Sequence, residues 1–250
     1  WEKLRAAQGE DAKESLLQRI YSQVTDLGTI AVLRKGIEHL GCHFTMCYFP
    51  PSSTLNEESG RLFESNILTV VRQIRYSVQN ENSIDMGLFL NGLPILTMEL
   101  KNQLTGQNVK HSENQYKNDR DYKEPLLQFK RCMVHFCVDN NKVSMTTRLS
   151  GTRTFFLPYN QDLENPPVEK GYRTKYLWEQ ILTPTSLLDI IESFVHLSRE
   201  KEFFFNDKTQ KIDTKIKEVL IFPRYHQLDL IRKFRGQLKV DGPGKNYLVQ

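Results

Sequence analysis

The spacing of apolar residues predicts several helices in the first part of the chain. Apolar side chains recur three or four positions apart over 13–26 and 29–40, with Gly28 between the two segments. A similar stripe over 58–77 predicts a longer helix, whose apolar positions are Phe63, Ile67, Val70, Val71 and Ile74. Between them, the apolar run HFTMCYF at 43–49 predicts a strand.

The middle of the chain is typical of a β-hairpin. Two apolar runs, IDMGLFL at 84–90 and LPILTMELK at 93–101, flank Asn91-Gly92. Asn-Gly tolerates the positive φ angles that tight hairpin turns require, so we expect two paired strands here. The polar residues 105–123 that follow predict a loop and then a helix.

The second half alternates between apolar and irregular stretches. We expect strands over 126–138 and 142–148, and irregular chain over the proline-dotted residues 158–186. Ser186, with Asp189 three residues later, predicts the start of a helix. The charged residues 199–218 predict a linker, after which a new unit begins. The alternation of predicted helices and strands favours an α/β fold.

Composition narrows the class of protein. The chain has 250 residues, which allows one or two domains, and 39% of them are hydrophobic while 26% are charged. These values exclude a disordered polyelectrolyte and a small disulfide-rich scaffold. No apolar run approaches the roughly 18 residues that a membrane span needs, so we expect a soluble, cytoplasmic protein without a membrane partner. Because the chain begins at Trp1 without a methionine, we expect a fragment of a longer protein.

Charge and cysteine content point to no specific ligand. The net charge of +4 and the pI of about 8.8 are compatible with nucleic-acid binding but too mild to establish it. The four cysteines form two pairs, Cys42 with Cys47 and Cys132 with Cys137, and four intervening residues are compatible with zinc. Both pairs lie in strand-like apolar runs, which favours buried thiols in a reducing compartment.

Three residues of the hairpin carry candidate chemistry. Asp85 is the one charged residue in the first apolar run, and Glu99 and Lys101 end the second run two positions apart, hence on one face. Two carboxylates beside an ammonium group are what metal-assisted phosphodiester hydrolysis requires. The carboxylates hold Mg²⁺, which acidifies a water, while the lysine steadies that water and the charge on phosphorus.

Strand register tests this hypothesis. A two-residue turn pairs Leu90 with Leu93 and Asp85 with Met98, which turns Glu99 to the opposite face. The site therefore requires a three-residue connection or a β-bulge, for example at Gly87. The simpler alternative is a surface salt bridge between Glu99 and Lys101, with Asp85 capping a strand.

The hairpin sequence IDMGLFLNGLPILTMELKN resembles the nuclease core of the restriction subunit of type I restriction–modification enzymes, a member of the PD-(D/E)xK nuclease class. The segments VVRQIRYSVQNENSID before it, TGQNVKHSENQYKNDRDYKEPLLQFKRCMVHFCVDN after it and FPRYHQLDLIRKF near the end resemble the same family in the same order. The resemblance covers about residues 28 to 250 and extends to the start of the chain. It implies an α/β fold with a restriction-endonuclease-like mixed sheet that is flanked by helices and followed by a helical connector.

The resemblance implies roles for individual residues. Asp85 and Glu99 would bind Mg²⁺ together with the backbone carbonyl of Leu100, and Lys101 would be the catalytic lysine. Related nucleases also use an acidic residue on an earlier helix, for which Glu38 is only a weak substitute.

The following helix carries two further candidates. Gln115 lies where related nucleases have a Gln-x-x-x-Tyr signature, but the fourth residue after it is Asp119, so the tyrosine is missing. Arg120 is a candidate phosphate contact. For Gln115 and Arg120 alike, an ordinary solvated helix face is the alternative interpretation.

The C-terminal segment resembles the Q-motif that opens superfamily 2 motor domains. In that motif Phe222, Arg224 and Gln227 would contribute to nucleotide binding, with the glutamine reading the adenine of ATP. The sequence ends before a phosphate-binding loop, and the glycines near Lys245 do not match the required pattern. ATP is therefore expected to act only on the full-length protein.

Three domains are predicted: an endonuclease domain over 1–157, a connector with a helix over 158–218, and the start of a motor domain over 219–250. The resemblance implies cleavage of double-stranded DNA within a complex of methylation and specificity subunits. One alternative is a non-catalytic assembly module that docks the motor onto those subunits. Another is an autonomous nuclease, against which the Q-motif argues.

Overall fold

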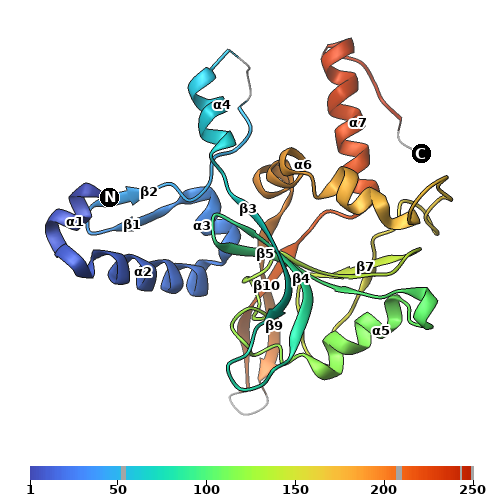
Figure 1. The fold of residues 1–250 in the computed structure, drawn as a ribbon, viewed down its shortest axis with the longest axis horizontal. Coiled ribbons are helices and arrows are strands. Elements are labelled where there is room, and N and C mark those ends of the chain that lie inside the picture. The colour runs from blue at the N-terminus through green and yellow to red at the C-terminus, as the bar shows by residue number, and fades with distance from the viewer. Residues whose placement is uncertain (52–54, 207–209, 243, 249–250) are drawn as a thin grey trace.

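A six-stranded mixed sheet forms the centre of the computed structural model, which describes residues 1–51, 55–206, 210–242 and 244–248 (Figure 1). The strand order follows the chain, and all neighbours are antiparallel except β5 and β6, which are parallel. The strands are β3 (Leu68–Arg75), β4 (Ser83–Leu90), β5 (Leu93–Leu100), β6 (Val134–Val138), β7 (Val143–Thr146) and β8 (Leu157–Pro158). The predicted α/β class is confirmed, and the sheet is consistent with a restriction-endonuclease-like fold.

The N-terminal segment projects from one side of the sheet (Figure 1). It contains α1 (Glu2–Gln8), a 3-10 turn (Gly9–Asp11), α2 (Ala12–Leu27), α3 (Thr29–Lys35) and a hairpin of β1 (Ile37–His39) and β2 (Cys42–Phe44). The two predicted helices are confirmed, but the second ends at Lys35 rather than at residue 40. Gly36 explains this early end, because its φ of 69° suits glycine and a Cβ there would lie 2.4 Å from the Phe44 carbonyl oxygen.

The prediction of one helix over 58–77 is wrong. The segment forms α4 (Glu57–Glu64) and then the edge strand β3. The Asn66 side chain separates them, because its amide donates to the carbonyl oxygens of Tyr48 and Phe63 while its oxygen accepts from the Tyr48 amide. The predicted strand over 43–49 is also too long, since β2 ends at Phe44.

Helical segments cover the two faces of the sheet. Cys137 and its neighbours Phe136 and Val138 point to opposite faces, as alternation along β6 requires. The Cys137 face packs against α5 (Val109–Asn114) and the π-helical turn Gln115–Asp119. The other face packs against the π-helical turn Leu177–Ile181, α6 (Pro184–Asp189) and the π-helical turn Ile190–Phe194. Two 3-10 turns, Gln103–Thr105 and Arg173–Lys175, complete the helical segments.

Predicted boundaries in this half of the chain need correction. The predicted helix in 105–123 is confirmed, and β6 and β7 confirm the strands predicted within 126–138 and 142–148 in shorter form. The helix predicted from Ser186 begins earlier, at Pro184, because proline suits the first turn of a helix. The Ser186 hydroxyl does not cap it and donates instead to the Ile181 carbonyl oxygen.

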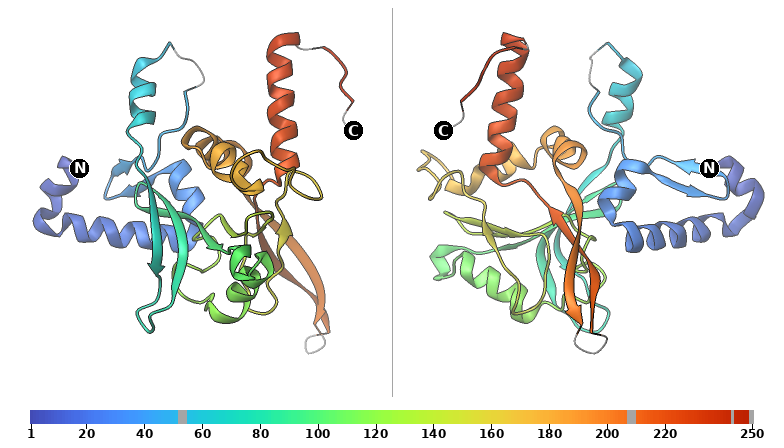
Figure 2. Two further views of the ribbon diagram at one scale, coloured as in Figure 1. Left: turned by 45° about the vertical axis from the view of Figure 1, so that its right-hand side comes forward. Right: turned by 180° about the vertical axis from the view of Figure 1, so that it is seen from behind.

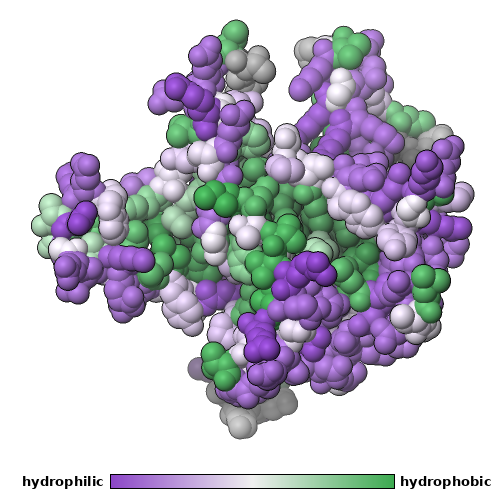
Figure 3. Space-filling view, in the orientation of Figure 1, coloured by the Kyte–Doolittle hydropathy of each residue, from purple (hydrophilic) through white to green (hydrophobic). Residues whose placement is uncertain are grey.

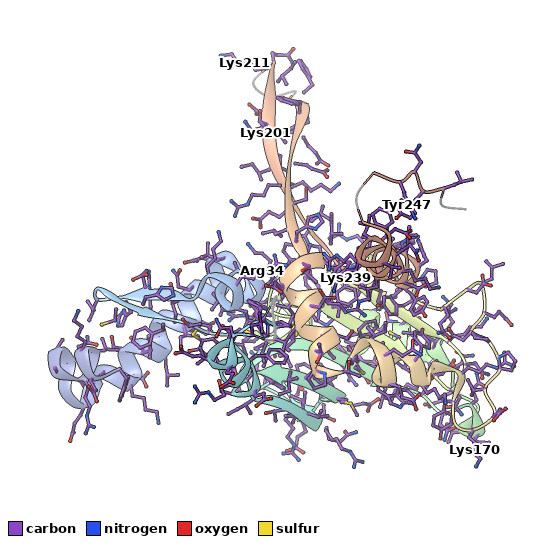
Figure 4. The ribbon with its side chains drawn as sticks, turned by 90° about the horizontal axis from the view of Figure 1, so that it is seen from above. Arg34, Lys170, Lys201, Lys211, Lys239 and Tyr247 are labelled. Atoms are coloured by element: carbon purple, nitrogen blue, oxygen red, sulfur yellow. The ribbon has the colours of Figure 1, made fainter. Side chains whose placement is uncertain are left out.

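Residues 199–218 are not a linker. They belong to a β-ribbon of β9 (His196–Asn206) and β10 (Lys211–Ile221), which projects from the body of the molecule (Figures 2 and 4). Both of its faces carry exposed side chains, so charged residues fit a strand here, as in the ion pair between Lys217 and Glu202 at 2.9 Å. After the ribbon, α7 (Tyr225–Asp241) extends away from the sheet.

One hydrophobic core runs through the three predicted domains. Leu220, Phe222 and Leu228 are buried in the same cluster as Phe136 of β6, and the Phe222 ring meets the Phe136 ring edge-on at 5.9 Å. The domain boundaries at 157 and 218 stay a prediction. Apolar side chains gather over the centre of the face seen in Figure 3, and polar ones cover the projecting elements. In the described ranges, no helix has the length and apolar character to cross a membrane.

Candidate active site

The register of the central hairpin decides where the candidate carboxylates lie. A two-residue turn joins β4 and β5, and Leu90 pairs with Leu93. The pairing then shifts between Leu88 and Phe89, because Ile95 is an extra residue on β5 without a partner on β4. This is a β-bulge, which moves every later residue of β5 by one position relative to β4.

The bulge brings the two acids level with one another. Beyond it Met86 pairs with Met98, so the next positions along the strands are Asp85 and Glu99. The predicted irregularity is confirmed and takes the form of a bulge, but it does not lie at Gly87, which keeps a regular partner on β5. The three-residue connection is absent from this hairpin.

Asp85 lies where β4 and β5 separate. Its Oδ2 accepts a hydrogen bond from the backbone amide of Leu100 at 2.8 Å. Its Oδ1 accepts from Nε2 of Gln73 on β3 at 3.3 Å. The carboxylate of Asp85 is thus held by groups from both neighbouring strands.

Glu99 is fully buried. Its Oε1 accepts from Arg120 Nε at 2.7 Å, and its Oε2 has no hydrogen-bond partner in the described chain. Burial raises the pKa of Glu99 to about 7; the Arg120 guanidinium opposes this rise, and the nearby Asp85 carboxylate adds to it. The alternative of a surface salt bridge between Glu99 and Lys101 is wrong, because Glu99 pairs with Arg120.

The segment after α5 delivers Arg120. Asp139 at the end of β6 accepts from the Val109 amide at 2.8 Å and anchors the start of α5. The helix then widens into a π-turn, closed by the Arg120 amide donating to the Gln115 carbonyl oxygen at 3.1 Å. The Arg120 side chain is 9% exposed, and Gln115 Oε1 is buried with no hydrogen-bond partner among the residues that the structure describes, so a solvated helix face describes neither. Contact of either residue with DNA stays a prediction.

Lys101 directly follows β5, at the same end of the sheet. Its backbone amide donates to the Val138 carbonyl oxygen at 2.8 Å, whereas its ammonium group has no hydrogen bond or ion pair with any described residue. Lys101 and Leu100 line a cavity of about 620 Å³, together with Met86, Met98 and Trp178. Among the described residues the lysine charge therefore has no partner, and Lys101 follows Glu99 by two positions at this end of the sheet.

A buried polar network supports the strand that carries Glu99. The Thr97 hydroxyl lies 2.8 Å from the Tyr116 hydroxyl and 2.7 Å from His135 Nδ1. Burial lowers the pKa of His135 to about 3, so the ring is neutral at physiological pH. The network ties β5 and β6 to the π-turn that presents Arg120.

The donor set fits a hard divalent cation. Glu99 contributes a buried oxygen without a partner, and Asp85 lies next to it; carboxylate oxygens are the ligands that Mg²⁺ prefers. Groups of three or more acidic, histidine or cysteine side chains suited to a metal do not occur in the described ranges. A third protein ligand would then come from a neutral oxygen, and the backbone carbonyl of Leu100 is the predicted one.

Other candidates lie outside this site. Phe222 is 4% exposed within the core, and Gln227 Oε1 accepts from the Arg224 amide at 3.0 Å as part of the first turn of α7. Their role in nucleotide binding stays a prediction. Glu38 lies in β1, where its carboxylate is 2.7 Å from His43 Nδ1.

The cysteines are free thiols. Cys47, Cys132 and Cys137 are buried as expected, and Cys42 is half-buried. Burial raises the pKa of Cys47 and Cys132 to about 12, so both stay protonated.

Sequence reasoning missed two residues of the site. Gln73 contacts Asp85, and the Ser83 hydroxyl donates to Gln73 Oε1 at 2.8 Å. The apolar stripe over 58–77 concealed Gln73, since a helix would have turned it away from the hairpin. Pairing the segment with β4 as a strand is the signal that places Gln73 opposite Asp85.

Comparison with known proteins gives one match, which covers the strands that carry the candidate site. A search of the curated proteins finds no match. A family model does match residues 54–154, which include β3 to β7, α5 and the residues Asp85, Glu99, Lys101 and Arg120. That model describes the N terminus of the R protein of type I restriction enzymes, and residues 54–154 are similar to it.

Proposed function

We propose that this chain is the endonuclease region of a type I restriction subunit and that it hydrolyses phosphodiester bonds in double-stranded DNA with Mg²⁺. The observation that carries the proposal is the bulge at Ile95, which sets Asp85 level with Glu99. A hairpin in regular register would separate the two acids. Within the described ranges, Oε2 of Glu99 and the ammonium group of Lys101 have no partners, and both lie at the same end of the sheet, which supports the same chemistry.

Each residue of the site has a distinct part in this chemistry. Asp85, Glu99 and the Leu100 carbonyl would hold Mg²⁺, which when bound polarises the scissile phosphate and acidifies a water. The Lys101 ammonium would hold the attacking water and stabilise the negative charge that develops on phosphorus. Arg120 holds Glu99 in place and lowers the energy of its ionised form.

The remaining proposals follow from the family. Sequence choice would belong to a specificity subunit, with methylation subunits in the same cytoplasmic complex. ATP-driven translocation would belong to a motor domain whose Q-motif includes Phe222, Arg224 and Gln227.

The test uses the complete restriction complex with Asp85→Asn, Glu99→Gln or Lys101→Met in the R subunit. Each change removes a group that acts at the phosphate, so we expect DNA cleavage to fall by at least about 10²-fold while ATP hydrolysis persists. Glu81→Gln is a matched control, since Glu81 is an exposed acid close in sequence to Asp85. Unchanged cleavage in all three variants would contradict the proposal.

A non-catalytic docking role has one observation in its favour. Phe203, Phe205, Ile212 and Ile216 are more than half exposed, and the pairing of Phe205 with Ile212 sets them on one face of the β9–β10 ribbon. On this alternative, Phe205→Ser would release partner subunits, and the three site substitutions would impair assembly rather than cleavage. Native mass measurement of the complex separates the two functions.

A further inference from the structure

Gln73 has an unusual backbone for a residue inside a strand. Its φ is 49°, in the left-handed region, although its neighbours pair regularly, Arg72 with Met86 and Ile74 with Ile84. Among the described residues it is the one non-glycine residue within a strand that has a positive φ. This conformation is unfavourable for an L-residue and persists only where other contacts enforce it.

The strained residue lies opposite Asp85 and binds its side chain. Gln73 Nε2 donates to Asp85 Oδ1 at 3.3 Å, and the Leu100 amide donates to Asp85 Oδ2 at 2.8 Å. Each carboxylate oxygen of Asp85 thus has its own donor, one from β3 and one from β5. Two donors on two oxygens prevent rotation of the carboxylate, which a single donor would allow.

The orientation of the Gln73 amide is itself fixed. Its Oε1 accepts from the Ser83 hydroxyl at 2.8 Å, which leaves Nε2 to face Asp85. Gln73, Ser83 and Asp85 therefore form a chain of side-chain hydrogen bonds between β3 and β4. A residue that lacks the amide cannot complete this chain.

We propose that Gln73 is a positioning residue that orients the Asp85 carboxylate for binding a divalent cation. The inference rests on the proposed function, and it adds a residue that acts on the metal only through Asp85. It also explains the left-handed backbone, because the fold retains an unfavourable conformation at the one position of β3 that faces the candidate metal ligand. Groups that orient metal ligands in this way typically change metal affinity by about 10–100-fold.

The test measures Mn²⁺ binding to this chain by titration calorimetry, together with thermal unfolding in a chelator. Gln73→Gly removes the amide and at the same time suits the positive φ. We expect an unfolding temperature equal to or above that of the wild type and an Mn²⁺ affinity about tenfold lower. A purely structural role for Gln73 predicts unchanged affinity, and that result would overturn the proposal.

A second variant guards against an indirect effect of glycine on the strand. Gln73→Asn keeps a residue that tolerates the left-handed region, but its shorter side chain brings the amide less far towards Asp85. We expect the same loss of Mn²⁺ affinity as for glycine. Ser83→Ala, which frees the amide to turn, should give a smaller loss; wild-type affinity in both variants would contradict the proposed role.

Two controls separate this inference from the function on which it rests. Leu40→Gly relieves an almost identical φ of 48° in the β1–β2 turn, so it should leave Mn²⁺ affinity unchanged. Asp85→Asn removes the proposed ligand. If Asp85→Asn abolishes binding while the Gln73 variants bind normally, only the positioning role fails; if Asp85→Asn binds normally, the proposed metal site fails as well.

Discussion

Arg120 and Glu99 form an ion pair of 2.7 Å in which the carboxylate side chain is fully buried and the guanidinium side chain is 9% exposed. Burying an unpaired carboxylate is strongly unfavourable, so this contact allows an acid to lie inside the sheet. Arg120 occupies only one of the two oxygens. The other oxygen stays available to a cation, which links the stability of this region to its proposed chemistry.

Replacing Arg120 should destabilise the fold in a pH-dependent way. In Arg120→Met the pKa of Glu99 rises above its value of about 7, because the group that opposed the effect of burial is gone. A carboxyl group with a raised folded-state pKa favours folding while protonated, and this contribution is lost as pH rises. We expect a loss of about 3–5 kcal/mol at pH 8 and a smaller one at pH 6, measured by urea unfolding.

The double variant Arg120→Met with Glu99→Gln is the matched control, since it removes both charges. It should be more stable than Arg120→Met alone at pH 8 and should lose the pH dependence. An equal loss for Arg120→Met at both pH values would show that Glu99 does not titrate in this range.

Divalent cation binding should strengthen as pH rises towards neutrality. A cation binds ionised Glu99, and burial raises the pKa of Glu99 from its ordinary value of 4.5 to about 7. Below pH 7 one proton must leave for each ion bound, so the apparent Mn²⁺ affinity should rise by up to about tenfold per pH unit and level off above pH 8. Without metal, the same raised pKa means that folding stability falls between about pH 4.5 and 7. Calorimetry in buffers of different ionisation enthalpy measures the released proton, and an affinity independent of pH below 7 would contradict the assignment.

Lys101 should matter for cleavage and not for stability. Its ammonium group has no partner among the described residues, so Lys101→Met should change the free energy of unfolding by no more than about 0.5 kcal/mol. Cleavage by the complete complex should fall by about 10²-fold or more, because the transition state loses a cation. Mn²⁺ affinity should be retained or raised, since a positive charge leaves the site; a variant that cleaves normally would remove Lys101 from the mechanism.

Phe222 should behave as a core residue of the region that contains the central sheet. It is 4% exposed and packs against Phe136 and Tyr159, which lie on the central sheet and beside it. We expect Phe222→Ala to destabilise the chain by about 3–5 kcal/mol in urea unfolding. Neighbouring His226→Ala, at an exposed position, should have little effect. If Phe222→Ala and His226→Ala both changed the free energy of unfolding only slightly, the C-terminal segment would fold separately from the sheet.

The sequence predicts the hairpin and its acids well because strand alternation and the Asn-Gly turn act locally. The apolar stripe over 58–77 led to a wrong prediction of a helix because β3 is an edge strand. Exposed polar residues break the alternation of this strand, and its remaining apolar residues fall at helical spacing. The charged β9–β10 ribbon was missed for a related reason: strands that are exposed on both faces lose the apolar signal of a sheet.

The site depends on contacts between distant parts of the chain. The pairing of Glu99 with Arg120, 21 residues later, follows from how the π-turn packs on the sheet and has no local signature. A bulge could be inferred from the sequence only because a metal site requires Asp85 and Glu99 to lie on one face of the hairpin. Its location at Ile95, next to Pro94, depends on a proline that lacks the amide needed for a regular ladder.

On the proposed function, Asp85 and Glu99 bind a divalent cation between them. Crystals of this chain soaked in Mn²⁺ at about pH 8, where Glu99 is ionised, test it directly through anomalous scattering. We predict a single strong peak in contact with one oxygen of Asp85 and with Oε2 of Glu99, which disappears in Asp85→Asn crystals. Ordered carboxylates with no peak between them, or acids turned to opposite faces of the hairpin, would contradict it.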